Sequence, residues 1–82
     1  MNAPDVKAAI ASVLHGIAPE VDLNSIAPDQ NFQEATDIDS FDFLNLLVGL
    51  HQELGVDIPE SDYGKLRSLN DLLSYLGART QR

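Results

Sequence analysis

The chain has 82 residues, 44% of them apolar, and 13 acidic against 5 basic side chains give a net charge of −8. This length predicts one small domain spanning residues 1–82, with a core too small for the deep substrate cavity of an autonomous enzyme. The charge argues against nucleic-acid binding, which needs clustered Lys and Arg, and favours a partner with a basic surface. Cysteine is absent, so the chain has no disulfide, thiolate metal site or nucleophilic thiol.

Neither a signal peptide nor a membrane span is predicted. Residues Met1 to Asp5 lack a basic start and a long apolar stretch. The most apolar run, Phe41 to Leu50, contains polar residues and is far shorter than the ~20 residues that cross a bilayer. We therefore expect a soluble, cytoplasmic protein that does not insert into membranes, and its size and charge favour a monomer.

The first predicted element is an amphipathic helix over about residues 4–17. Apolar side chains recur at three- and four-residue steps from Val6 to Ile17, as on one face of a helix. Asn2 is the expected N-cap, and Pro19 stops the helix because proline disfavours a helical residue before it.

From Pro19 to Asp39 the chain shows no sustained period. A connection of this length is usually functional or disordered. Four apolar side chains lie along it at irregular intervals: Val21, Leu23, Ile26 and Phe32. They predict an ordered crossover that contains a short turn or two and packs across the bundle through these side chains.

The second helix is predicted from Asp39 to Leu54, with Asp39 as N-cap and Gly55 as the C-terminal stop. A helical projection divides its apolar side chains into two groups. The group expected to face the core is Phe43, Leu46, Leu47, Leu50 and Leu54. The other group is Phe41, Leu44 and Val48. A globular helix needs only one apolar stripe, so the second group indicates a docking surface.

An extended tether follows at residues 56–59, then a short helical segment from Glu60 to Leu66. A capping box at Ser68 to Asp71 begins the last helix, which is expected to end at Gly77 and leave a frayed tail at about residues 78–82. The predicted fold is all-α, a small four-helix bundle of three main helices plus one short helix, with a long first crossover loop.

Acidic residues are concentrated between Phe32 and Asp62, where Lys and Arg are absent. The eight acids of this segment are Glu34, Asp37, Asp39, Asp42, Glu53, Asp57, Glu60 and Asp62. These acids surround the helix that carries the surplus apolar group. The acidic segment is therefore interpreted either as part of a docking surface or as an ordinary solvated face.

Ser40 lies at the first position of the second helix, where free N–H groups and the helix dipole favour a bound phosphate. An additional capping role is the simpler alternative. No neighbouring base and no Gly-x-Ser-x-Gly elbow accompany Ser40, so a serine hydrolase is not expected. The two histidines do not pair at helical spacing, and we expect no metal site and no catalytic residue.

Taken together, these features resemble those of the acyl carrier proteins. The similarity covers roughly Phe32 to Leu76, about half of the chain, and the helix–long loop–helix order covers the rest. The segments that carry it are Asp39-Ser40-Phe41-Asp42, then Leu44 and Leu46, Leu50-His51-Gln52-Glu53-Leu54-Gly55-Val56-Asp57-Ile58-Pro59, Leu69-Asn70-Asp71-Leu72 and Tyr75-Leu76.

The resemblance implies that a phosphopantetheinyl transferase attaches 4′-phosphopantetheine from coenzyme A to Ser40. Acyl groups would then be held as thioesters on this arm, whose thiol belongs to the cofactor, and passed to basic acyl-transferring, ligase or synthase enzymes. The implied partner surface consists of Asp39, Phe41, Asp42, Leu44, Val48, Glu53, Asp57, Glu60 and Asp62. The chain would be a carrier in fatty-acid, polyketide or specialised acyl metabolism and not an enzyme.

Several positions depart from the family pattern. Phe41 replaces the usual Leu, and Thr36-Asp37 stands where the family commonly has Leu-Gly. Asn45, His51 and Gln52 make the second helix less acidic than in typical fatty-acid carriers. A stand-alone aminoacyl, peptidyl or D-alanyl carrier is therefore the alternative with the same chemistry. A cofactor-free helical interaction module is the alternative of another class.

Overall fold

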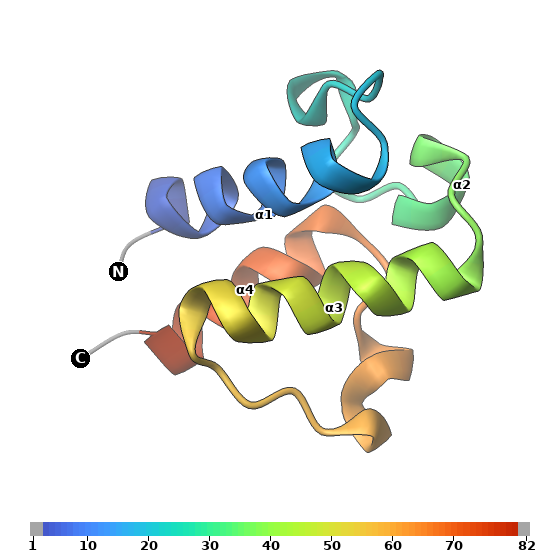
Figure 1. Ribbon diagram of the computed structural model, residues 1–82. Coiled ribbons are helices and arrows are strands. Elements are labelled where there is room, and N and C mark those ends of the chain that lie inside the picture. Colours follow the sequence, from blue (N-terminus) through green and yellow to red (C-terminus); the bar gives the residue numbers. More distant parts are fainter. Residues whose placement is uncertain (1–2, 81–82) are drawn as a thin grey trace.

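The structure is a computed structural model that describes residues 3–80 (Figure 1). Its elements in chain order are α1 (Ala3–Ile17), the 3-10 helix η1 (Leu23–Ser25), α2 (Phe32–Thr36), α3 (Ser40–Leu54), the 3-10 helix η2 (Glu60–Lys65) and α4 (Leu69–Thr80). Within these residues the only β pairing is an isolated bridge between Asn31 and Ser68. The predicted small all-α bundle is confirmed, and the expected cap at Asn2 lies outside the described residues.

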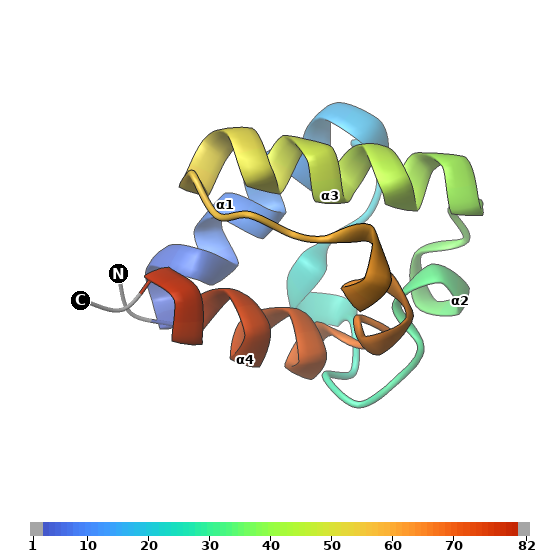
Figure 2. The same ribbon diagram turned by 90° about the horizontal axis from the view of Figure 1, so that it is seen from below.

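The core lies between the three long helices. α1 packs against both α3 and α4 and runs in the opposite direction to α3 (Figures 1 and 2). Ile10 and Leu14 of α1 meet Leu46, Leu50 and other leucines of α3 and α4 in one buried cluster. Nearly all of these side chains are fully excluded from solvent, as the helical periodicity predicts.

The crossover between α1 and α3 is ordered, and its anchors are those expected from the sequence. Leu23, Ile26 and Phe32 are buried, whereas Val21 is half-buried. Two backbone hydrogen bonds tie this segment to the start of α4, from Phe32 N to the Arg67 carbonyl (2.7 Å) and from Asn70 N to the Pro28 carbonyl (2.9 Å). The crossover also forms α2, a short α-helix capped by the side chain of Asn31.

α3 begins and ends where the sequence predicts. Asp39 Oδ1 accepts a hydrogen bond from Asp42 N (2.8 Å) at one end, and Gly55 adopts the left-handed conformation (φ 68°) at the other. The predicted core face is buried at Phe43, Leu46, Leu47 and Leu50, and Leu54 is half-buried.

α4 begins with the predicted capping box, since Ser68 Oγ accepts from Asp71 N (3.1 Å) and Asp71 Oδ2 accepts from Ser68 N (3.3 Å). Its predicted end at Gly77 is wrong. Gly77 does not take a positive φ, so the helix continues to Thr80, a buried residue whose hydroxyl donates to the Leu76 carbonyl (2.8 Å). Of the tail expected to fray, residues 78–80 are helical and residues 81–82 lie outside the described part of the chain.

Gly49 marks a close approach of α3 to α1. A Cβ atom added at Gly49 would lie 2.5 Å from Val13 Cγ1, which is closer than any van der Waals contact allows. Val13 is β-branched and has few rotamers with which to withdraw. Glycine in the middle of a helix is therefore explained here by packing.

We expect Gly49→Ala to lower the free energy of unfolding by about 1 kcal/mol, because overpacking outweighs the gain in helix propensity. Gly77→Ala is the matched control, since nothing lies within 4 Å of a Cβ at Gly77. The control should gain about 0.5–1 kcal/mol in urea denaturation. Equal stabilisation by both substitutions would contradict the close approach.

Candidate functional site

Ser40 is an exposed residue at the first position of α3. The capping role is taken by its neighbour, because Asp39 supplies both the side-chain acceptor for Asp42 N and the carbonyl acceptor for Phe43 N (3.0 Å). The Ser40 hydroxyl is thus not used to close the helix. It faces solvent and is open to chemical modification.

Gln33 of α2 is the described residue whose side chain forms a hydrogen bond with the Ser40 hydroxyl. Its amide Nε2 donates to Ser40 Oγ over 3.4 Å. An amide is not a base at neutral pH, so this contact cannot turn Ser40 into a nucleophile. Sequence reasoning missed Gln33, since it lies in the non-periodic crossover and only the packing of α2 beside the start of α3 brings it close (Figures 1 and 2).

The chain bends sharply between α2 and α3 at Asp37, which adopts the left-handed conformation (φ 58°). Glycine reaches this conformation most easily, and Asp is among the few other residues that tolerate it. The position where the resembled family commonly has glycine therefore keeps a left-handed bend here. Thr36, at the position of the usual leucine, is buried, and its hydroxyl donates to the Phe32 carbonyl (2.8 Å).

Phe41, Leu44 and Val48 form an exposed apolar ridge along α3. Their exposed fractions are 69%, 40% and 44%, and they are the large hydrophobic residues of the described chain that remain exposed. The division of α3 into a core face and an outward apolar face is therefore as predicted. Such an exposed apolar ridge on a small domain indicates an interaction surface.

Most of the predicted acidic residues are available at the surface. Asp39, Glu53, Asp57 and Glu60 are exposed, and Asp42 is half-buried. They are distributed at both ends of α3 and in the segment that follows it. This placement puts negative charge at both ends of the helix that carries the apolar ridge.

Asp62 does not belong to this free acidic rim. Its side chain is only 17% exposed. The hydroxyl of Tyr75 donates to Asp62 Oδ2 over 2.6 Å, and Lys65 Nζ (3.3 Å) and Arg79 Nη2 (3.9 Å) lie close to the carboxylate. Arg79 also stacks over the Tyr75 ring, 3.5 Å from its centroid. Asp62 thus joins η2 to α4, and we assign it a structural role.

Electrostatics in this cluster follow from the hydrogen bond. The bond from Tyr75, with further help from Lys65 and Arg79, lowers the pKa of Asp62 from its usual 3.8. Burial, and then the same hydrogen bond, raises the pKa of Tyr75 above its usual 10.0. The cluster therefore stabilises the fold when Asp62 is ionised and Tyr75 is protonated.

We expect Tyr75→Phe to lower stability near neutral pH, with a difference from the wild type that closes on acidification. A carboxyl whose pKa is lowered on folding stabilises above its unfolded pKa of 3.8, and this contribution is lost as the pH falls through the folded value. Thermal melts from pH 7 to pH 2 measure this. Tyr63→Phe is the control, because the Tyr63 hydroxyl forms no hydrogen bond in the described structure. A gap that stays constant down to pH 2 would show that the hydroxyl acts through packing alone.

His51 stabilises the turn after α3, where its Nδ1 donates to the Val56 carbonyl over 2.7 Å and lies 3.8 Å from Asp57 Oδ1.

Residues 3–80 contain no group of three or more potential metal ligands. They also contain no helix long and apolar enough to cross a bilayer.

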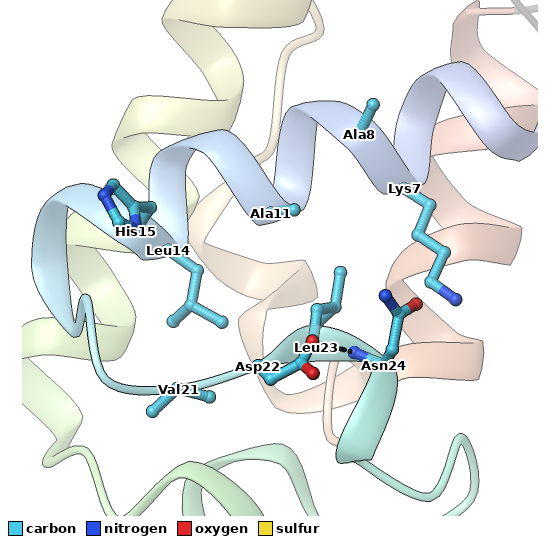
Figure 3. A pocket seen from close by; sticks show the side chains of 9 residues that line it. All are labelled: Lys7, Ala8, Ala11, Leu14, His15, Val21, Asp22, Leu23 and Asn24. Carbon is cyan, nitrogen blue, oxygen red and sulfur yellow. Dashed lines mark hydrogen bonds between the residues drawn. The ribbon is translucent and has the colours of Figure 1, made fainter.

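The surface of the described chain includes a smaller and a larger hollow. The smaller, about 200 Å³, is on the side of α3 that faces the tether and η2, and it is lined by Leu47, Val48, His51, Asp57, Ile58 and Tyr63. The larger, about 440 Å³, lies between α1 and the crossover, with Lys7 and His15 at opposite ends (Figure 3). The larger hollow contains none of the predicted site residues.

The family described as "Phosphopantetheine attachment site" matches residues 4–76, nearly the whole chain. The chain therefore belongs to the phosphopantetheine-binding family of acyl carrier proteins, whose cofactor is 4′-phosphopantetheine. An exposed serine hydroxyl that is not engaged in capping suits a group attached through a phosphate ester.

Several curated relatives support the same family. The chain is 34% identical over 71 residues to the acyl carrier protein of Thermosynechococcus vestitus, covering 87% of this chain and 82% of the relative. It is 35% identical over 57 residues to that of Lactobacillus acidophilus, with 70% and 71% covered. The acyl carrier protein of Helicobacter hepaticus is 29% identical over 73 residues, with 89% and 90% covered.

Proposed function

We propose that Ser40 carries 4′-phosphopantetheine and that the protein holds acyl groups as thioesters on this arm. The observation that carries the proposal is the exposed Ser40 hydroxyl at the start of α3, which is left free by the Asp39 cap and lies within the residues that match the family. The cofactor supplies the thiol that the cysteine-free chain lacks.

Attachment would use coenzyme A as the donor. Ser40 Oγ forms a new bond to phosphorus, the phosphoanhydride bond to the nucleotide breaks, and adenosine 3′,5′-bisphosphate leaves. The hydroxyl proton passes to a base of the transferase, because Gln33, whose side chain is hydrogen-bonded to Ser40 Oγ, cannot accept it. The protein is then the substrate of this reaction, and we propose that it has no catalytic activity of its own.

The partner surface would be the apolar ridge with its acidic rim. The ridge is Phe41, Leu44 and Val48, and the rim is Asp39, Asp42, Glu53, Asp57 and Glu60. Negative charge around an apolar centre suits enzymes with a basic surface, because charge attraction accelerates encounter and apolar burial holds the complex. The transferase and acyl-transferring, ligase or synthase enzymes are the proposed partners.

Incubation with coenzyme A, Mg²⁺ and a broad-specificity transferase is expected to add the mass of one phosphopantetheine group. Ser40→Ala should abolish the gain because it removes the accepting oxygen. Ser25→Ala and Ser74→Ala are matched controls, since both serines are exposed and neither is expected to be modified. Intact-mass spectrometry measures all four proteins. A folded wild-type protein that gains no mass would favour a cofactor-free interaction module.

Substitutions on the two faces of α3 should separate binding from stability. Leu46→Ala deletes a fully buried side chain and should cost ~2–5 kcal/mol in urea denaturation. Leu44→Asp, on the ridge, should change stability by less than about 1 kcal/mol. It should raise the KM of the transferase for this protein by about tenfold, as loss of an interface anchor does. Equal destabilisation by both would contradict the assignment of the two faces.

An aminoacyl or peptidyl carrier is the second candidate, and the surface of α3 favours it. Asn45, His51 and Gln52 are exposed and uncharged or weakly basic, which leaves the middle of the helix without acids. Loading of the modified protein by amino-acid-activating enzymes, compared with loading by fatty-acyl ligases, distinguishes the two cargo classes.

A further inference from the structure

The Ser40 hydroxyl is bordered by a neutral hydrogen-bond donor and by negative charge. Gln33 Nε2 lies 3.4 Å from Ser40 Oγ. Glu34, Asp37, Asp39 and Asp42 flank the same segment, and between Phe32 and Asp62 the chain has no Lys or Arg. A phosphodiester on Ser40 would add one more negative charge without a nearby cation from this segment to balance it.

We propose that the side-chain amide of Gln33 is the positioning residue for the phosphodiester on Ser40. This inference rests on the proposed attachment at Ser40. The non-bridging oxygens of a phosphate ester lie about one P–O bond beyond Oγ, so the donor that now reaches Oγ reaches one of them after a small rotation of its side chain. A neutral donor binds the anion and leaves the acidic surface used for partner recognition unchanged.

The fold holds Gln33 in place through its neighbour. Phe32 is fully buried, and its ring packs against Phe43 with the centroids 6.1 Å apart. Phe32 N also bonds to the Arg67 carbonyl (2.7 Å). Because Phe32 precedes Gln33 and Phe43 lies one helical turn after Ser40, this aromatic contact fixes α2 against the start of α3. The amide and the hydroxyl are thereby held together across seven residues of sequence.

The direct test is a comparison of the modified and unmodified proteins by NMR. In wild-type protein, attachment should shift the side-chain amide signals of Gln33. The signals of Gln52, whose exposed side chain forms no hydrogen bond in the described structure, should stay unchanged. Gln33→Ala should shift the phosphorus-31 resonance of the modified protein, and Gln52→Ala should not. An unmoved Gln33 amide and an unmoved phosphorus resonance would overturn the proposal.

A stability comparison checks the same contact independently. Modification should stabilise the fold less in Gln33→Ala than in wild-type protein. The difference in the unfolding equilibrium constant should be roughly tenfold, the lower end of the range for a hydrogen bond to a charged group. Gln33→Glu should be worse than alanine because it places an acid beside the phosphate. Gln33→Lys restores a donor and should recover the wild-type effect. All four side chains are compatible with the half-buried helical position of Gln33, so the unmodified variants should fold alike.

The two proposals fail in different ways. Absence of phosphopantetheine on wild-type protein would contradict attachment at Ser40, and no Gln33 variant is needed to see this. The role of Gln33 alone would be overturned by a different result. In that case the wild-type protein is modified at Ser40, but modification changes the stability of Gln33→Ala, Gln33→Glu and the wild type by the same amount.

Discussion

Burial of one face of α3 is the constraint on which the rest of the structure depends. Leu46, Leu47 and Leu50 are almost completely excluded from solvent and fill the space against α1 and α4. A helix rotated about its axis would expose them, at a cost of roughly 1.5–3 kcal/mol for each side chain. At Gly49 the helix also lies so close to Val13 of α1 that an added Cβ atom would clash. Once this face is fixed, the ridge of Phe41, Leu44 and Val48 must point outward, whereas Ser40 is exposed because it is the first residue of α3.

The same packing organises the surroundings of Ser40. Phe43, on the buried face, also holds Phe32, and Phe32 places α2 next to the start of α3. The side chain of Asp39 caps the start of the helix, so the Ser40 hydroxyl is not needed as the cap. An exposed hydroxyl, a neutral donor beside it and an acidic apolar surface along the helix are thus consequences of one packed core. Each suits a protein that is modified and then recognised by other enzymes.

Features with a local cause could be predicted from the sequence. The ends of α3 follow from Asp39 and Gly55, the start of α4 follows from Ser68 and Asp71, and the two faces of α3 follow from helical periodicity. Features that depend on contacts between distant segments could not. The Gln33 contact arises from the packing of α2, and the removal of Asp62 from the acidic rim arises from Tyr75, thirteen residues away. Gly77 is a further case, because a glycine acts as a C-cap by adopting the left-handed conformation itself, and Gly77 does not adopt it.

The measurement that tests the orientation of α3 most directly is solvent paramagnetic relaxation of side-chain NMR signals with a soluble, uncharged probe. The account predicts strong relaxation of Phe41, Leu44 and Val48 and protection of Leu46, Leu47 and Leu50 in the same helix. Equal relaxation of the two groups, or protection of the ridge, would contradict the orientation of α3 from which the outward apolar ridge follows.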